Sequence, residues 1–301
     1  MPTPVLECVP NVSEGRDRRV IDGLADAVRA IPGVHLADVH ADPDHHRSVF
    51  TLLGTPAAVQ AGALALAAAV FESVDMRLHH GVHPRLGALD VVPFVPLRGL
   101  DASDAVAAAH EVGRALGERH GVPVYFYGQA ASRSDRQTLA HVRSGEYEGL
   151  AARLADPTHR PDVGAARFDA VRGATAVGAR GILVAFNVWL DSQDLGAARE
   201  IARTVRESSG GLPALQALGL AAASDRRVQV SMNLLDTGRT SLARAFDAVS
   251  DVATRRGIAI ARSELVGLAP RAAFDGRAPD SVGLAGLQPA QYLDTHLDAL
   301  P

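Results

Sequence analysis

The sequence lacks lysine altogether, contains one cysteine and carries little excess charge of either sign. Its 30 basic residues are therefore all arginine, which together with the abundant alanine and glycine indicates GC-rich coding. Cys8 has no second cysteine to pair with, which excludes an internal disulfide and fits a reducing compartment. The net charge of −4 excludes a general attraction to nucleic acid or to anionic membranes.

Signals for export or membrane insertion are also missing. No charged-then-apolar leader opens the sequence. The most apolar window, residues 57–71, is mostly alanine and contains Gln60, so we expect it to be too short and too weakly hydrophobic to span a bilayer. We expect a globular, cytoplasmic protein with neither a membrane nor a nucleic-acid partner. A chain of 301 residues, 47% of them hydrophobic, is long enough for one large or two medium domains.

The hydrophobic periodicity predicts the order βαββαβ twice. In the first half the expected strands are residues 5–9, 35–40, 48–53, 88–94 and 124–127, and the expected helices are residues 16–30, 55–74 and 101–120. In the second half the strands are residues 181–186, 215–220, 228–234 and 258–261, and the helices are residues 194–207 and 241–255.

This order predicts an α/β (α+β) protein made of two tandem ferredoxin-like βαββαβ subdomains, each with its helices on one face of an antiparallel sheet. Asn11-Val12 and Asn187-Val188 are expected to end the first strand of each half. The polar, proline-containing stretch of residues 155–166 is the expected linker. Two such units would leave a groove between them.

The most informative segment is His79-His80-Gly81-Val82-His83-Pro84-Arg85-Leu86-Gly87-Ala88-Leu89-Asp90. Proline disfavours the α region for its predecessor, so we expect His83 to be extended on a loop. Imidazole takes and returns a proton near neutral pH, and Arg85 offers a fork-shaped donor for carboxylates. Gly87 allows close approach of the backbone to a ligand. The same residues are also compatible with a purely structural segment, namely a capped loop that carries a surface arginine.

Motifs along almost the whole chain resemble the glutamate formiminotransferase family, whose animal members are fused to a cyclodeaminase. The printed sequence has no cyclodeaminase half and resembles the stand-alone, bacterial-type form. The resemblance rests on residues 7–15 (ECVPNVSEG), 79–94, 123–128 (PVYFYG), 143–148 (RSGEYE), 173–180 (GATAVGAR), 185–187 (AFN), 233–236 (NLLD) and 265–268 (LVGL). It implies the two-subdomain formiminotransferase fold, which we divide into residues 1–178 and 179–301.

The resemblance implies folate-dependent transfer of a formimino group between N-formimino-L-glutamate and tetrahydrofolate, in histidine degradation and one-carbon metabolism. It implies tetrahydrofolate as co-substrate, no metal, and a homodimer. His83 becomes the general acid and base, with Arg85 and His40 as further catalytic residues. Asp38, Arg47 and His80 are expected to bind substrate. The expected folate-binding residues, whose glycines would admit the pterin and whose Phe168 would stack on it, are Gly164, Ala165, Ala166, Arg167, Phe168, Asp169, Ala170, Val171, Arg172 and Gly173.

The chain departs from the family pattern at four positions, which bear on the substrate more than on the fold. His40 stands where the animal enzymes have an acid, and we expect it to hydrogen-bond the reacting amine and to titrate together with His83. His80 replaces a lysine, Val82 an acid and Gln129 a glutamate. The physiological formimino donor or acceptor and the folate polyglutamate preference stay open.

Two other functions remain at this point. Seven of the twelve histidines are His35, His40, His45, His46, His79, His80 and His83. With nearby aspartates they suggest a metal-dependent hydrolase of a formimino or amide substrate. Against this, Pro84 makes a continuous helix through His79 and His83 unlikely, and we expect His45 and His46 on a solvated turn beside Asp42-Pro43-Asp44. A non-catalytic folate-binding module is the second alternative.

Overall fold

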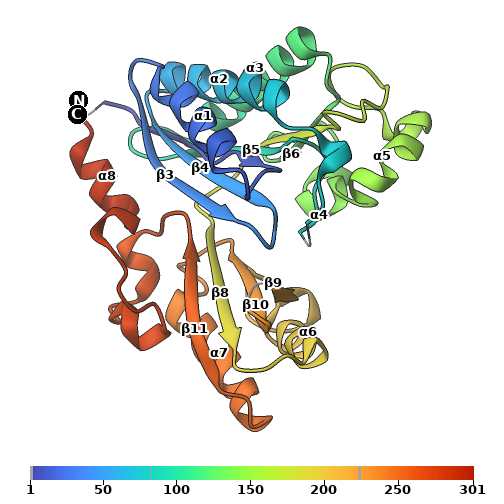
Figure 1. Cartoon of the computed structure of the whole chain (residues 1–301). Helices are drawn as coiled ribbons and strands as arrows, with labels where there is room; N and C mark the ends of the chain where they lie inside the picture. The colour runs from blue at the N-terminus through green and yellow to red at the C-terminus, as the bar shows by residue number, and fades with distance from the viewer. Residues whose placement is uncertain (1–2, 82, 223–224) are drawn as a thin grey trace. The chain divides into compact units, whose positions relative to one another are not determined.

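The computed structural model describes residues 3–81, 83–222 and 225–301, so that Val82 lies outside the described residues. The chain divides into two compact units, residues 1–180 together with Pro301, and residues 181–300 (Figure 1). We describe each unit by itself. A boundary after Gly178, as placed from the sequence, would cut through strand β7 (Thr175–Ala179).

Unit 1 is built on a seven-stranded sheet in the order β3-β4-β1/β2-β5-β7-β6. Its other strands are β1 (Leu6–Cys8), β2 (Asn11–Val12), β3 (Val34–Asp42), β4 (Arg47–Gly54), β5 (Leu89–Pro96) and β6 (Val124–Gly128). Strands β1 and β2 are one strand interrupted around Pro10, since both pair antiparallel with β4 and β5. The first four positions have the antiparallel ferredoxin-like order. Strand β7 then lies between β5 and β6 and is parallel to both.

Three helices cover one face of this sheet, α1 (Arg18–Arg29), α2 (Pro56–Ser73) and α3 (Ala102–His120) (Figure 1). Each begins where a side chain caps the first turn, namely Asp17, Thr55 and Asp101. Helix α3 ends at Gly121, whose φ of 68° is the left-handed conformation that closes many helices. The sequence predicted all three helices within a few residues.

Helix α2 corrects the expectation drawn from the apolar window. It has 18 residues, and by length and composition alone it is long and apolar enough to cross a membrane. The helix extends beyond the window of residues 57–71, so the argument from length and hydropathy does not exclude a membrane span. In unit 1 its apolar face, including Val59, Leu66 and Val70, is buried in the core against the sheet and its neighbouring helices. That packing accounts for its apolar character without a bilayer.

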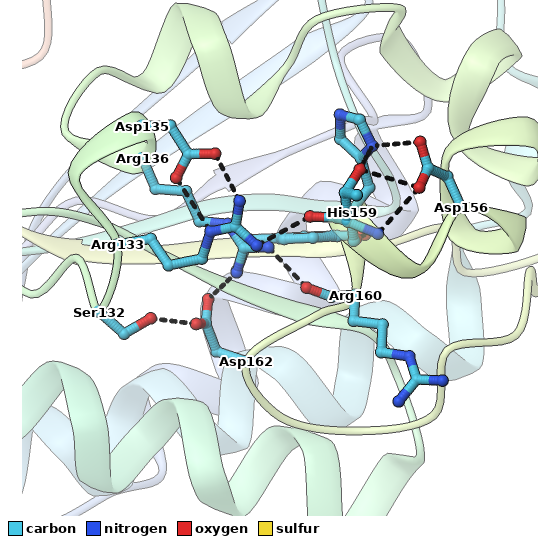
Figure 2. Close-up of polar contacts among 10 residues, drawn as sticks. Ser132, Arg133, Asp135, Arg136, Asp156, His159, Arg160 and Asp162 are labelled. Carbon is cyan, nitrogen blue, oxygen red and sulfur yellow. Dashed lines mark hydrogen bonds and ion pairs between the residues drawn. The ribbon is translucent and has the colours of Figure 1, made fainter.

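The segment between β6 and β7 is part of unit 1 and is not a linker. It contains α4 (Leu139–Val142) and α5 (Glu146–Ala155), whose apolar side chains pack on the sheet face opposite α1–α3. Figure 2 shows how residues 156–162 are held. The buried Arg136 donates to the Asp162 carboxylate at 2.5 Å and to the Arg160 carbonyl at 2.5 Å. Asp162 also accepts from the backbone amide of Phe126 on β6 at 2.8 Å.

Unit 2 confirms the predicted ferredoxin-like arrangement. Its strands are β8 (Val184–Leu190), β9 (Leu215–Ala222), β10 (Arg227–Leu234) and β11 (Ile260–Val266), in the antiparallel order β11-β8-β10-β9. Helices α6 (Leu195–Val205) and α7 (Leu242–Arg255) pack on one face, and α8 (Leu293–Ala299) follows near the C-terminus (Figure 1).

Strand β8 begins later than predicted. Its pairing with β10 sets Val228 opposite Leu190 and Leu234 opposite Val184. Val184, Phe186, Val188 and Leu190 then alternate toward the helices. Asn187 therefore lies in the middle of the strand, and the expectation that Asn187-Val188 ends it is wrong.

Short 3₁₀ helices complete the described chain. They are η1 (Met76–Leu78), η2 (Ser134–Arg136), η3 (Pro157–His159), η4 (Glu207–Ser209), η5 (Arg271–Phe274), η6 (Pro279–Val282) and η7 (Pro289–Gln291).

Candidate functional site

A small cavity in unit 1 lies where β2 and β3 end and where β4 and β5 begin. Because neighbouring antiparallel strands run in opposite directions, these four ends meet at one edge of the sheet. The loop between η1 and β5 supplies the remaining wall. The lining residues are Ser13, His45, His46, Arg47, His79, His83, Arg85 and Asp90.

His83 is held as a neutral imidazole. Its Nδ1 lies 2.8 Å from the Pro84 carbonyl oxygen, which only accepts, so we assign the ring proton to Nδ1. Arg47 Nη1, which only donates, lies 2.7 Å from Nε2 and 2.8 Å from Nδ1. It therefore lies beside both ring nitrogens, of which only the unprotonated Nε2 can accept, and it is not aligned with the Nε2 lone pair. Burial of the ring, together with the charges of Arg47 and Arg143, lowers the pKa of His83 well below its usual range.

Arg47 and Arg143 bring two guanidinium groups close to this ring. Arg47 begins β4, while Arg143 follows α4, which the sequence pattern did not predict. The carboxylate of Asp90, buried on β5, accepts from Arg143 and from the Leu86 amide at 2.8 Å. Burial and the neighbouring Arg143 lower the pKa of Arg47 to about 9. The electrostatic environment of His83 is thus strongly positive.

Arg85 is occupied by carboxylates of the protein itself. Its Nη1 and Nη2 donate to the two oxygens of Glu148 at 2.8 and 2.5 Å, and Nη1 also lies 3.4 Å from Glu146. Its Nε donates to Nδ1 of His79 at 3.3 Å. The fork that the sequence offered for a substrate carboxylate is therefore filled, and the geometry favours a positioning role for Arg85.

His79 and His46 form a buried stack beside Arg85. Their rings are parallel within 9°, with centroids 4.3 Å apart. His79 Nε2 donates to the His46 carbonyl at 2.7 Å, and burial lowers the pKa of His79 to about 4. His45 and His46 are each only 9% exposed, so the expectation of a solvated turn is wrong. The reason is that Asp42 accepts from His45 at 2.6 Å and Glu14 lies 3.3 Å from His46.

The structure brings together only part of the predicted catalytic and substrate set. His83, Arg85 and Arg47 all line the cavity. His40 and Asp38 lie on β3, opposite Val49 and Thr51, and are outside the lining. The polar contacts of His83 are with Arg47 and Pro84, so the expected pairing of His40 with His83 has no support within residues 3–81 and 83–222.

His80 and Gln129 contribute through their backbone. The side chain of His80 is exposed, while its carbonyl lies 3.1 Å from Nδ1 of His46. The amide of Gln129 donates to the Ala179 carbonyl at 2.9 Å. Neither residue lines the cavity.

The two glycines of the predicted folate run serve the protein's own packing. Gly164 and Gly173 have φ values of 84° and 68°. A Cβ on Gly164 would lie 2.0 Å from the Val122 carbonyl oxygen, and one on Gly173 would lie 2.3 Å from that of Leu86. The idea that these glycines admit a flat pterin is therefore replaced by a structural reason. It also follows that enlarging Gly173 would disturb the backbone next to the histidine loop.

The rest of the run is divided between structure and surface. Asp169 accepts from the amides of Val171 and Arg172 at 2.9 and 3.2 Å and so fixes the turn. Ala165, Ala166 and Arg167 are exposed. Phe168 is half-buried, with its ring centroid 5.5 Å from that of Tyr147 on α5. Neither Phe168 nor Arg167 lines the cavity.

A metal site is not formed by the described histidines and acids. No group of three His, Cys, Asp or Glu side chains within residues 3–81, 83–222 and 225–301 is arranged to hold an ion. The histidine rings are held instead by backbone carbonyls, Asp42, Glu14 and arginines.

Sequence reasoning missed Arg143 and Glu148 as members of this site, and it considered Asp90 only as a possible metal ligand. Asp90 and Arg143 are 53 positions apart, and Arg85 and Glu148 are 63 positions apart. A usable signal was nevertheless present, because Arg143, Glu146 and Glu148 all belong to the motif RSGEYE at residues 143–148.

Fold and site together define an α/β protein of two ferredoxin-like units with a neutral imidazole in a cavity lined mainly by histidine and arginine. Such a site is suited to moving a proton on an anionic substrate.

Comparison with known proteins identifies the family. The N-terminal subdomain of the formiminotransferase domain matches residues 5–180, and the formiminotransferase domain matches residues 185–278. Glutamate formimidoyltransferase of Streptococcus pyogenes serotype M1 is 41% identical over 90% of this chain and 90% of its own length. That of Thermoplasma acidophilum is 36% identical over 98% of this chain and 97% of its own length. The chain belongs to the formiminotransferase family, as its motifs predicted, with the tandem subdomains of that family.

The fused animal proteins are related over part of their length. Formimidoyltransferase-cyclodeaminase of Sus scrofa is 42% identical over 91% of this chain, which spans 52% of that protein.

Proposed function

We propose that the chain is a one-carbon transferase that moves the formimino group from N-formimino-L-glutamate to tetrahydrofolate, giving 5-formiminotetrahydrofolate and L-glutamate. The observation that carries this proposal is the neutral His83, whose Nε2 lies 2.7 Å from Arg47 in a cavity lined mainly by histidine and arginine. The names of the relatives in Streptococcus pyogenes and Thermoplasma acidophilum support the same reaction. The proposed reaction would belong to histidine degradation and one-carbon metabolism, as the resemblance to the family implies.

The reaction needs one proton to change places. N5 of tetrahydrofolate forms a bond to the amidine carbon, and its proton passes to Nε2 of His83. The bond from that carbon to the α-nitrogen of glutamate then breaks, and His83 returns the proton to this nitrogen. A single imidazole thus acts as base and then as acid. Because its pKa is well below the usual value, His83 is neutral and ready to accept a proton at neutral pH.

Tetrahydrofolate acts as a co-substrate and binds, in this proposal, along residues 164–173. The half-buried Phe168 would stack on the pterin, and the exposed Arg167 would meet a glutamyl carboxylate. Arg85 would hold the histidine stack in place, and His40, Asp38 and His80 remain candidates for outer contacts with substrate.

Two further properties follow the family and are open to direct test. We propose a homodimer located in the cytoplasm. Light scattering on the purified protein would give twice the chain mass for a dimer, and the chain mass alone would reject it.

The function is tested by initial rates with both substrates. Purified protein, formiminoglutamate and tetrahydrofolate should give the absorbance change of the folate product, and omission of either substrate should abolish it. Binding of folate without turnover would instead favour the non-catalytic module.

A further inference from the structure

The arginines beside His83 carry more positive charge than the protein neutralises. Arg143 pairs with Asp90, and Asp42 is bound by His45 and by the amides of Asp44 and His45. Arg47 forms no ion pair with any carboxylate of the described chain, and its Nη1 contacts only the ring of His83. The Arg47 guanidinium therefore has no direct ion pair in the described chain, and the carboxylates of Asp90 and Asp42 act on it only at longer range.

Two arginine donors near His83 lack an acceptor, one on Arg47, which lines the cavity, and one on Arg143, which is outside the lining but close enough to lower the pKa of Arg47. The Nε atoms of Arg47 and Arg143 are both buried, and neither has a hydrogen-bond partner among the residues that the structure describes. Leaving a buried donor unsatisfied is unfavourable, and more so when the group is charged. A carboxylate has two oxygens that can accept hydrogen bonds, so it could satisfy both donors and balance the charge of Arg47.

The volume of the cavity limits the size of the chemical group that can carry this anion. The empty space, counted out to the open solvent at its mouth, is about 180 Å³. Sites for whole small molecules are usually about 300–1,000 Å³. The cavity therefore has the size for one polar end of a substrate, and the rest of the substrate and the pterin would lie outside it.

We propose that Arg47 and Arg143 form the subsite for the α-carboxylate of the amino-acid substrate. This inference rests on the proposed function, in which the reacting nitrogen is bonded to the α-carbon. The carboxylate carbon and that nitrogen are then two bonds apart, so anchoring the carboxylate places the nitrogen beside His83. The enzyme would accordingly select α-amino acids and reject amines of the same length that lack the α-carboxylate.

The same contact would free the base. Arg47 Nη1 now lies 2.7 Å from Nε2 of His83 and restricts access to that nitrogen. A carboxylate that draws the Arg47 donors toward itself leaves Nε2 open to the N5 proton. Substrate binding and activation of His83 are thereby coupled through one residue.

The test compares two donors in wild type and in an Arg47→Gln variant. The donors are N-formimino-L-glutamate and N-formimino-γ-aminobutyrate, which lacks only the α-carboxylate. Wild type should prefer the first in kcat/KM by roughly 10- to 100-fold, the range for a hydrogen-bonded charge. Arg47→Gln should erase most of this preference, raise KM for formiminoglutamate and leave KM for tetrahydrofolate unchanged. Exposed Arg114 on α3 supplies the matched control, because Arg114→Gln makes the same chemical change on a free helix face.

The outcomes separate the two claims. No turnover of either donor by wild type would reject the proposed function and this inference with it. Normal turnover by wild type, with the preference retained in a folded Arg47→Gln variant, would overturn the inference alone. If that variant fails to fold, Arg47→Lys keeps the charge but lacks the Nε donor and the fork, and it should lose at least half of the preference on a logarithmic scale. An unchanged preference in Arg47→Lys would likewise overturn the proposal.

Discussion

At the scale of single residues, the site depends on which groups hold which protons. His83 is neutral because its ring is buried among positive charges, and its tautomer is set by the Pro84 carbonyl. Arg85 shows the opposite situation, since its charge is already matched by Glu148. His83 and Arg85 belong to the same short motif but differ in their proposed roles. His83 would transfer the proton, and Arg85 would hold neighbouring side chains in position.

Replacing His83 tests its role as the proton carrier. His83→Ala should lower kcat by roughly 100- to 10,000-fold, the usual contribution of a general acid and base. Folate affinity should stay close to that of wild type, because the ring lies outside residues 164–173. Stopped assays of turnover and a fluorescence titration of folate measure the two effects, and turnover within a factor of about three of wild type would reject the role.

The pH dependence of kcat/KM follows from the lowered pKa of His83. The reaction needs the neutral form, so the rate falls only when the pH drops through the pKa of the folded enzyme, which lies well below 6.5. The acid limb should therefore have its midpoint below pH 6.5. Arg47→Gln removes a positive neighbour and should move that midpoint upward. A midpoint at or above pH 6.5 in wild type would contradict the assigned environment.

The lowered pKa values of His79 and His83 also affect stability. The unfolded chain takes up protons on both residues as the pH falls below about 6.5, whereas the folded protein does not. The unfolded state then binds more protons, so the free energy of unfolding decreases as the pH falls below that value.

At the scale of elements, the site is made by strand ends and by one turn that follows α4. The sequence predicted α1, α2, α3 and the four-strand order of each ferredoxin-like unit, because amphipathic periodicity and capping residues are local signals. It did not predict α4, α5 or β7. Strand β7 is parallel to its neighbours β5 and β6, which come from earlier in the chain. A parallel pairing between distant strands leaves no pattern in the local sequence. Without β7, the polar residues 155–166 were therefore predicted to be a linker.

Two glycines of equal φ distinguish backbone strain from a steric clash. Gly121 and Gly173 both have a φ of 68°, but a Cβ on Gly121 meets nothing within 4 Å while one on Gly173 meets Leu86 and Gly87 backbone atoms. Gly121→Ala should cost roughly 1–2 kcal/mol from the left-handed conformation alone. Gly173→Ala should cost roughly 1–3 kcal/mol more, because the strand end before β5 must shift. Chemical denaturation of both variants measures the difference, and equal costs would show that the close approach is unimportant.

The turn at residues 164–173 carries the folate prediction. Phe168→Ala should raise KM for tetrahydrofolate by roughly 2- to 12-fold, the equivalent of about 0.5–1.5 kcal/mol for an aromatic pair. The KM for formiminoglutamate serves as the internal control and should not change. If both KM values stayed at the wild-type level, the pterin would have to bind elsewhere.

At the scale of the whole molecule, the family assignment and the observed fold agree with each other. The arrangement of side chains in the site could not be derived from the family or from the fold alone. Periodicity and ordered motifs predicted two tandem units, and both family subdomains match the chain. The arginine pair beside His83 could not be predicted from spacing, because Arg47 and Arg143 approach the same ring from β4 and from the end of α4. RSGEYE, at residues 143–148, was recognisable only as a family motif. Its side chains acquire their roles from tertiary structure.

The most direct test follows the formimino carbon itself. N-formimino-L-glutamate labelled with carbon-13 at that carbon is mixed with tetrahydrofolate and with protein dialysed against a strong chelator. We expect the label to appear in the folate product one-to-one with glutamate released, at an undiminished rate, because the reaction as proposed needs only the proton carried by His83. Label appearing as free formamide or formate, or activity that depends on adding back a divalent ion, would contradict this account and favour a metal-dependent hydrolase.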